Sequence, residues 1–254
     1  MMNKTAISCE PTVSIRTEED PQAMFRCDSR GFTLLEIITA IFILAILVSL
    51  VMGAFDAIFS NTDRINEGTD LNEMGSAALD RMAEDLKAIH VMQYPRYQQP
   101  DTREEKKDKP DIYRVEGKTT YVGGHTFAWL RFTSMAHLPL NHEDQEGIAE
   151  IVYYVQETPD NGFIIRRADH LYPYPEFEER ETDPELCERV LDFTLTYYDF
   201  EGKEHEQWDS ESDDTEYNTP RAIGIKLTLG DETAPYTLST QIALPVYRYK
   251  PLKR

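Results

Sequence analysis

Basic side chains are scarce in this chain of 254 residues. Lysine and arginine together number 26, against 46 aspartates and glutamates, which gives a formal net charge of −20. A surface this acidic repels phosphate backbones and anionic lipid headgroups. The composition therefore argues against nucleic-acid binding, and it argues against attachment to a membrane surface through charge.

Cysteine is also rare, and the familiar motifs of catalysis are missing. The three cysteines, Cys9, Cys27 and Cys187, have no CxxC spacing, which argues against a zinc site, a redox dithiol or a disulfide framework. The sequence has no GxSxG, P-loop or GxGxxG motif. We therefore expect a protein that is not an enzyme, that has no catalytic residues and that needs no cofactor.

One acidic stretch is a weak candidate for a metal site. Asp209, Glu211 and Asp213 alternate as ligands do in the first half of a calcium loop. The sixth position of such a loop would be Asp214 instead of glycine, and the twelfth position is not glutamate. A solvated acidic loop is the expected structure, and we expect no metal.

A single long apolar run stands out against this polar background. It extends over residues 32–55, and residues 37–55 contain no charged side chain. Nineteen helical residues span about 28 Å, close to the hydrocarbon thickness of a bilayer. Glu36 lies at the start of the run, where a carboxylate is costly unless a cation lies at the same depth. Cleavage after Gly31 would supply one, the free amino group of Phe32.

The residues around this glycine carry a family resemblance. Arg30-Gly31-Phe32-Thr33-Leu34-Leu35-Glu36, followed by an apolar run, resembles the signal of type IV pilins and pseudopilins. The resemblance implies that a prepilin peptidase cleaves after Gly31 and that Phe32 is then N-methylated. It also implies that Glu36 pairs with the N-terminal amine of a neighbouring subunit during filament assembly.

The segment before the cleavage site is longer and more acidic than leaders of this family. Residues 1–31 contain four basic and five acidic residues. The mature chain therefore has 22 basic and 41 acidic residues, which gives a net charge of −19. Starting at Met24 would give a short basic leader, which is the alternative that we leave open. Arg26 and Arg30 precede the apolar run, and acidic residues dominate after it, so the positive-inside rule places the rest of the chain in the periplasm.

The sequence divides into four parts on this basis. We expect a leader over 1–31, a membrane-spanning helix over 32–56, a periplasmic amphipathic helix over 57–95 and a β domain over 96–254. The amphipathic helix has one apolar stripe, which packs either on the protein's own β domain, as we expect, or on a partner helix. Tyr94-Pro95 is expected to end the helix. The stripe consists of Leu71, Met74, Ala78, Met82, Leu86 and Ile89.

The β domain is expected to contain eight strands. Glu116-Gly117-Lys118 is interpreted as the turn of one hairpin, and residues 158–162 as the turn of another. Gly123-Gly124 is interpreted as a further turn. The strands are expected at 112–115, 119–122, 126–133, 148–156, 163–168, 190–200, 221–229 and 236–246.

Part of this region resembles minor pseudopilin J of the type II secretion system. The resemblance lies in residues 190–199, Gly202, Trp208 and the Pro-Arg-Ala strand that begins at residue 220. It implies an α+β pilin-like fold, with a long helix packed on two antiparallel sheets. It also implies a single-pass protein of the inner membrane that joins minor pseudopilins I and K in the pseudopilus tip complex.

Two other functions stay open from the sequence alone. A minor pilin of a type IV pilus or competence system would have the same N-terminal signal. A net charge of −19 on the mature chain fits DNA uptake poorly, because it repels the phosphate backbone. A membrane-anchored enzyme would have it too, but no catalytic motif supports that alternative. The expected partners are therefore other pseudopilins, the prepilin peptidase and the inner membrane, with no nucleic acid.

Overall fold

The computed structural model describes residues 33–100, 111–139, 146–160 and 162–249. The chain forms two compact units, Met1–Ala57 and Ile58–Arg254. Helix α1, Leu34–Lys87, is a single element of 54 residues that contributes to both units.

The described part of the first unit is helical and apolar. Leu34–Asp56 has a mean hydropathy of 2.8, and none of this stretch is buried within the protein. It is long and apolar enough to cross a membrane, and an apolar helix exposed on every face needs lipid or other apolar helices around it. At its start the N–H of Glu36 donates to the carbonyl oxygen of Thr33 at 3.0 Å and to its hydroxyl at 3.3 Å.

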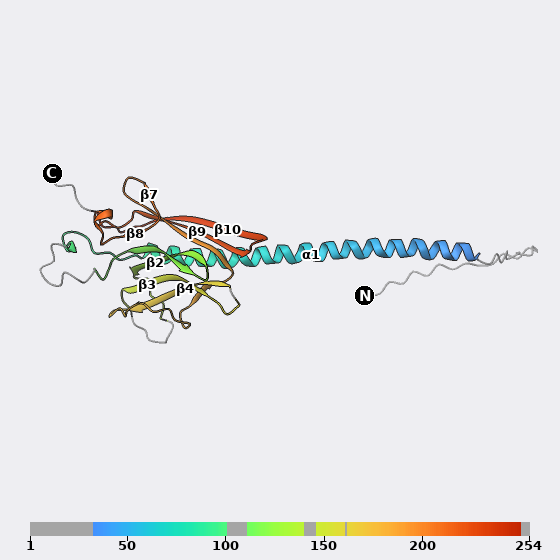
Figure 1. Ribbon diagram of the computed structural model, residues 1–254, viewed down its shortest axis with the longest axis horizontal. Helices are drawn as coiled ribbons and strands as arrows, with labels where there is room; N and C mark the ends of the chain where they lie inside the picture. The colour runs from blue at the N-terminus through green and yellow to red at the C-terminus, as the bar shows by residue number, and fades with distance from the viewer. Residues whose placement is uncertain (1–32, 101–110, 140–145, 161, 250–254) are drawn as a thin grey trace, which may run out of the picture. The chain divides into compact units, whose positions relative to one another are not determined.

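The second unit contains two antiparallel sheets (Figure 1). The larger sheet has the order β5-β4-β3-β2-β1-β8, and the smaller one has the order β10-β9-β6-β7. The strands of the larger sheet are β1 Glu116–Val122, β2 His125–Ser134, β3 Ala149–Glu157, β4 Phe163–Leu171, β5 Glu185–Cys187 and β8 Trp208–Asp209. Those of the smaller sheet are β6 Val190–Tyr198, β7 Glu204–His205, β9 Ala222–Asp231 and β10 Ala234–Ala243. A short 3-10 helix, η2, covers Asp213–Thr215.

The C-terminal half of α1 packs between these sheets. In Figure 1 it passes with β9 and β10 on one side and β2, β3 and β4 on the other. One hydrophobic cluster joins α1 to strands of both sheets, with Met82 and Leu86 from the helix, Ile151 from β3 and Leu227 from β9. The stripe is thus buried against the protein's own β domain, as expected. The α+β pilin-like fold is confirmed.

Several boundaries differ from those expected. α1 ends at Lys87 instead of near Pro95, because the chain then pairs with the end of β2. Ile89 forms a bridge with Ser134, and the N–H of His90 donates to the carbonyl of Thr133 at 2.8 Å.

The expected turn at residues 116–118 is also wrong. Glu116, Gly117 and Lys118 lie inside β1 and pair with β2. The β1–β2 turn is at Gly123-Gly124, where φ is +54° and +88°. The β3–β4 hairpin is confirmed, because β3 and β4 pair from Ala149–Leu171 to Glu157–Phe163.

Candidate functional site

Two of the three residues expected to act in processing and assembly lie outside the described part of the chain. Gly31 and Phe32, the cleavage and methylation residues, belong to the segment 1–32, for which we describe no structure. Glu36 is described, and it lies exposed in the first turn of α1. The structure therefore places one expected site residue, and it does so on the helix that the membrane would surround.

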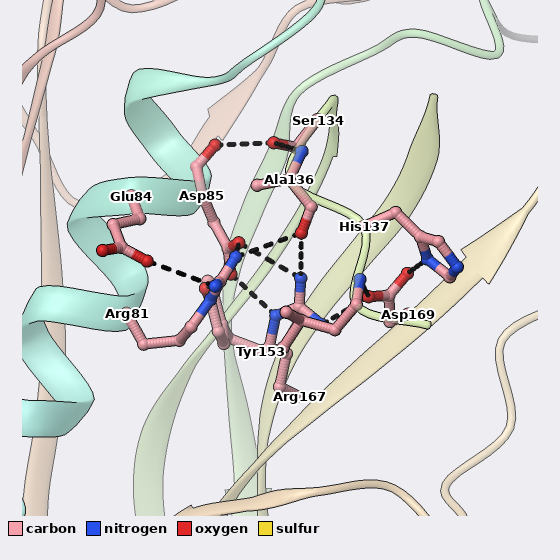
Figure 2. Close-up of polar contacts among 10 residues, drawn as sticks. Arg81, Glu84, Asp85, Ser134, Ala136, His137, Tyr153, Arg167 and Asp169 are labelled. Carbon is pink, nitrogen blue, oxygen red and sulfur yellow. Dashed lines mark hydrogen bonds and ion pairs between the residues drawn. The ribbon is translucent and has the colours of Figure 1, made fainter. Parts of the chain in front are cut away.

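A second charged site lies where α1 meets the larger sheet. Asp85 is on the buried side of the helix, and its side chain is fully buried. Arg167 of β4 donates to it twice, from Nε to Oδ2 at 2.7 Å and from Nη2 to Oδ1 at 3.1 Å. Arg81 and the hydroxyl of Tyr153 also donate to the same carboxylate (Figure 2). Asp85 thus binds the helix to two neighbouring strands, β3 and β4.

The backbone completes this attachment. The hydroxyl of Ser134, at the end of β2, donates to the carbonyl oxygen of Asp85 at 2.8 Å. The carbonyl oxygen of Ala136 accepts from both Arg81 and Arg167, at 3.0 Å each. Figure 2 shows the two guanidinium groups converging on this oxygen and on the Asp85 carboxylate. The contacts fix both the rotation of the helix and its position along its axis.

A second carboxylate extends the network away from the helix. Asp169 accepts from Nη1 of Arg167 at 2.6 Å, and its other oxygen lies 2.6 Å from Nδ1 of His137. The N–H of Leu138 also donates to Asp169, at 2.9 Å. Two carboxylates therefore surround the fully buried guanidinium of Arg167, which is the condition under which a buried charge is tolerated.

The ionisation of these groups follows from their surroundings. Burial raises the pKa of Tyr153 well above its usual value, and the negative charge of Asp85 raises it further. Burial by itself would lower the pKa of Arg167. The hydrogen bonds and charges of Asp85 and Asp169 outweigh burial, so the pKa of Arg167 lies above its usual value. Tyr153 stays a neutral donor and Arg167 stays a cation, which suits a permanent structural contact and does not suit proton transfer.

A similar centre surrounds Arg248, after β10. Its guanidinium is fully buried and lies 3.0 Å from Asp111 and 3.1 Å from Glu211. It also donates to the carbonyl oxygens of Ser210 and Tyr217, at 2.5 Å and 2.7 Å. The C-terminal segment is thereby bound to the segment that precedes β1 and to the loop that follows β8.

This second centre includes part of the weak metal candidate. Glu211 accepts from Arg248 and, at 2.8 Å, from the hydroxyl of Tyr97. Asp209 accepts from the N–H of Glu211 at 2.9 Å, while Asp213 begins η2. Over the described ranges, no group of three His, Cys, Asp or Glu side chains is arranged to hold a metal ion. Glu211 is therefore engaged in a contact between protein segments.

Sequence reasoning missed both arginine centres, although one signal was present. Asp85 lies three residues after Met82 and four before Ile89, so it interrupts the apolar stripe on the buried face of the helix. A carboxylate at such a position requires a cation from another element. Arg167, in a buried strand, is the matching signal, but nothing in the sequence pairs the two.

Comparison with known families identifies this architecture. The family described as "Type II secretion system (T2SS), protein J" matches residues 53–239, and the prokaryotic N-terminal methylation motif matches residues 26–52. The chain belongs to the type II secretion system protein J family. A comparison with individually curated proteins gave no match.

Membership in this family settles the general function. The protein is a minor pseudopilin of the type II secretion system, and the alternative of a pilus or competence subunit is not favoured. The family is a structural component of the secretion machinery, and its members interact with other pseudopilins. The apolar helix and the methylation motif indicate a single-pass membrane anchor.

Proposed function

We propose that this pseudopilin acts in the tip complex of the pseudopilus, where it helps to initiate assembly and supports protein export across the outer membrane. The observation that carries the proposal is the combination of two matches, the protein J family over residues 53–239 and the methylation motif over residues 26–52. The anchoring of α1 by Asp85 supports a structural role, because it holds the helix in one position against the sheets. In this proposal the protein has no enzymatic activity of its own.

The proposal includes an orientation in the inner membrane. Arg26 and Arg30 precede the apolar helix, and Asp56 follows it, so residues after 56 lie in the periplasm. The leader then comprises 1–31 and the membrane segment 32–56. Protease added to spheroplasts should degrade the C-terminal unit and leave the N-terminal end protected. Protection of the C-terminal unit would contradict the orientation.

Processing by the prepilin peptidase is the first test of this role. We expect cleavage after Gly31 and methylation of Phe32, both visible by mass spectrometry of the mature N-terminus. Gly31→Ala should leave a larger, unprocessed protein. Gly53→Ala is the matched control, since no atom lies within 4 Å of a Cβ at that helical position, and it should be processed normally. A mature N-terminus after residue 40 would contradict the proposal.

The charge of Glu36 is the second test. Its helix is exposed on every face, and a carboxylate in hydrocarbon needs a partner such as the N-terminal amine of a neighbouring subunit. Glu36→Ala should leave cleavage intact but weaken assembly and secretion. Thr39→Ala is the control, because the Thr39 hydroxyl already donates to the carbonyl oxygens of Leu35 and Glu36 of its own helix, at 3.0 Å each. Normal secretion with Glu36→Ala would contradict the role.

The proposed partners are minor pseudopilins I and K. A subunit at the end of a helical array meets different neighbours on different faces, so its interfaces are heterologous. The mature chain has a net charge of −19. Either the partner surfaces are basic, or binding to the partners tightens as salt screens the repulsion between like charges. Co-purification with both partners at low and high salt distinguishes these cases. A folded protein that binds neither partner at any salt concentration would contradict the tip assignment.

A further inference from the structure

The outer edge of β10 has no partner strand in the part of the chain that the structure describes. β10 is the end strand of the smaller sheet, and it pairs only with β9. That pairing runs residue by residue from Ala234–Asp231 to Ala243–Ala222. The strand has ten residues, so its open edge is about 34 Å long.

The hydrogen-bond pattern shows which backbone groups face this open edge. The N–H of Leu244, just after β10, donates to the carbonyl oxygen of Arg221 on the β9 side, at 2.9 Å. Backbone groups point to alternate edges along an antiparallel strand. The even-numbered residues of β10 therefore bond to β9. The odd-numbered residues face the open edge, and these are Pro235, Thr237, Ser239, Gln241 and Ala243.

All five odd-numbered residues of β10 are exposed. The even-numbered side chains hold the strand in place, because they point toward α1. The hydroxyl of Tyr236 donates to Oδ1 of Asn72 at 2.9 Å, and the side chain of Leu238 occupies the space that a Cβ at Gly75 would need. The open edge is thus exposed to solvent along its length and fixed against the helix.

The composition of β10 is unusual for an uncovered edge. Its sequence, APYTLSTQIA, contains no charged side chain, although charged residues make up 28% of the chain. Uncovered edge strands are normally kept from pairing with other chains by charged side chains, bulges or proline. The pairing of β10 with β9 is regular, and Pro235 is only the second residue of the strand. The edge from Thr237 to Ala243 therefore has none of these protections.

The two faces of β10 indicate which side chains a partner strand needs. On the face toward α1, Tyr236 and Leu238 are partly exposed and pack against the hydrophobic core. On the opposite face the hydroxyl of Thr237 lies 3.1 Å from that of Thr228, and Ser239 is on the same face. Similar side chains pair favourably across strands. A matching segment therefore alternates apolar and hydroxyl side chains.

The charges near the edge indicate what lies at the end of that segment. Asp231 and Glu232, at the β9–β10 turn, are exposed. Arg189 contacts Asp231 at 3.0 Å, whereas Glu232 has no basic partner among the described residues. Lys226, opposite Ser239, is 3.2 Å from an aspartate of β6. A basic residue beside the turn would be attracted, while a second copy of this chain would bring another net charge of −19.

We propose that the open edge of β10 binds an extended segment of a partner protein by strand addition. The segment alternates apolar and hydroxyl side chains and carries a basic residue near Glu232. Its backbone pairs with the N–H and C=O groups of Thr237, Ser239 and Gln241, and its apolar side chains extend the core beside Leu238. This interaction surface does not depend on a place in the tip complex, so it can be tested without any other pseudopilin.

The test uses the full chain in detergent micelles and a synthetic peptide of alternating valine and threonine with a lysine at each end. Hydrogen exchange, resolved by residue, is measured with and without the peptide. In the free protein the amides of Thr237, Ser239 and Gln241 should exchange fast, while those of Leu238 and Thr240, which bond to β9, exchange slowly. With the peptide, exchange at the three fast amides should slow by at least about tenfold.

Two control peptides separate strand addition from other binding. The same peptide with every amide of the valine–threonine segment N-methylated keeps its side chains but has no N–H to donate, and it should bind at least about tenfold more weakly. A peptide with glutamates in place of the lysines should bind at least about threefold more weakly, because Glu232 repels it.

Two variants of one residue test the backbone of the edge directly. Ser239→Pro removes one N–H from the open edge and leaves the bonds to β9 in place, as Pro235 does at the same phase of the strand. It should weaken binding of the lysine peptide by about tenfold. Ser239→Ala keeps the N–H and should change binding by less than about twofold.

Three results would overturn the proposal. The first is equal binding of the N-methylated peptide, and the second is no binding of the lysine peptide up to about 1 mM. The third is slow exchange of Thr237, Ser239 and Gln241 in the peptide-free chain together with a dimer in ultracentrifugation, which would assign the edge to a second copy. If Ser239→Pro fails to fold by circular dichroism, the control peptides still decide.

Discussion

Removing the charge of Asp85 is expected to destabilise the protein strongly. The side chain is fully buried and accepts hydrogen bonds from Arg81, Arg167 and Tyr153. Asp85→Asn keeps the volume, but it removes the negative charge and replaces one acceptor oxygen with a donor. Arg167 then keeps only Asp169 as a charged partner, and the buried hydroxyl of Tyr153 competes for one remaining oxygen.

The size of the effect follows from these losses. Removing one partner of a buried ion pair costs about 3–5 kcal/mol, and a buried hydroxyl left without an acceptor costs about 1–3 kcal/mol. Both costs arise from the loss of the same carboxylate, so they are not additive. The free energy of unfolding is therefore expected to fall by about 3–5 kcal/mol in total. For a unit of this size, each kcal/mol corresponds to about 2–4 °C, so the Tm should fall by about 6–20 °C.

The assay is thermal and denaturant unfolding of the full chain in micelles, followed by circular dichroism. Glu84→Gln is the matched control, one residue away on the same helix. The Glu84 side chain is 67% exposed and its contact with Arg81 is 3.2 Å, so its loss should cost less than about 1 kcal/mol. Equal destabilisation by the two variants would refute the argument that burial of the Asp85 network sets the cost.

Three further predictions concern packing, acid stability and domain independence. Gly117→Ala should destabilise the protein by about 1–3 kcal/mol, because the added Cβ would lie 1.9 Å from the buried hydroxyl of Tyr197. Gly68→Ala should stabilise α1 by up to about 1 kcal/mol, because no atom lies within 4 Å of a Cβ at that position. Denaturant unfolding curves measure both changes. Partial burial acts to raise the pKa of Asp199. The hydrogen bonds that its carboxylate accepts outweigh the effect of burial, so the pKa lies below its ordinary value of 3.8. The stability it contributes is thus present above pH 3.8 and lost as pH falls through the lower folded value, and Asp199→Asn should remove that part of the acid dependence. The fragment from residue 58 onward, one compact unit, should fold alone and unfold cooperatively.

The sequence predicted the elements whose periodicity is local. The apolar run predicted the membrane helix, and the apolar stripe from Leu71 to Ile89 predicted the buried face of α1. Gly117 shows where this reasoning fails. Glycine between two strand-like segments indicates a turn, but here it lies within β1, where the hydroxyl of Tyr197 occupies the space of a Cβ. Tyr197 is 80 residues further along the chain, so no local pattern contains that contact.

The charged centres escaped prediction for the same reason. Asp85 and Arg167 are 82 residues apart, and Asp111 and Arg248 are 137 residues apart. Each residue by itself is one of many charged side chains in an acidic chain. Only the fold shows that these four are buried and paired.

These distant pairs join segments that no disulfide joins within the part of the chain that the structure describes. Cys187 is the only cysteine in the part of the chain that the structure describes, and burial raises the pKa of its thiol to about 12, so no disulfide within these residues joins distant segments. A disulfide stabilises mainly by restricting the unfolded chain, whereas a buried ion network must offset its own desolvation and often adds little net stability. Its contribution is then to fix where α1 lies against β4. We therefore expect Asp85→Leu combined with Arg167→Met to cost about 1–3 kcal/mol less than the sum of the two single variants, because each substitution removes the partner that the other would leave unpaired. In the double variant Arg81 keeps its contact with Glu84, and Asp169 keeps its contacts with His137 and the N–H of Leu138. The same double variant should still weaken pseudopilus assembly, because apolar side chains at this contact allow the helix to slide or rotate. A double variant that is stable and assembles normally would show that the network does not position the helix.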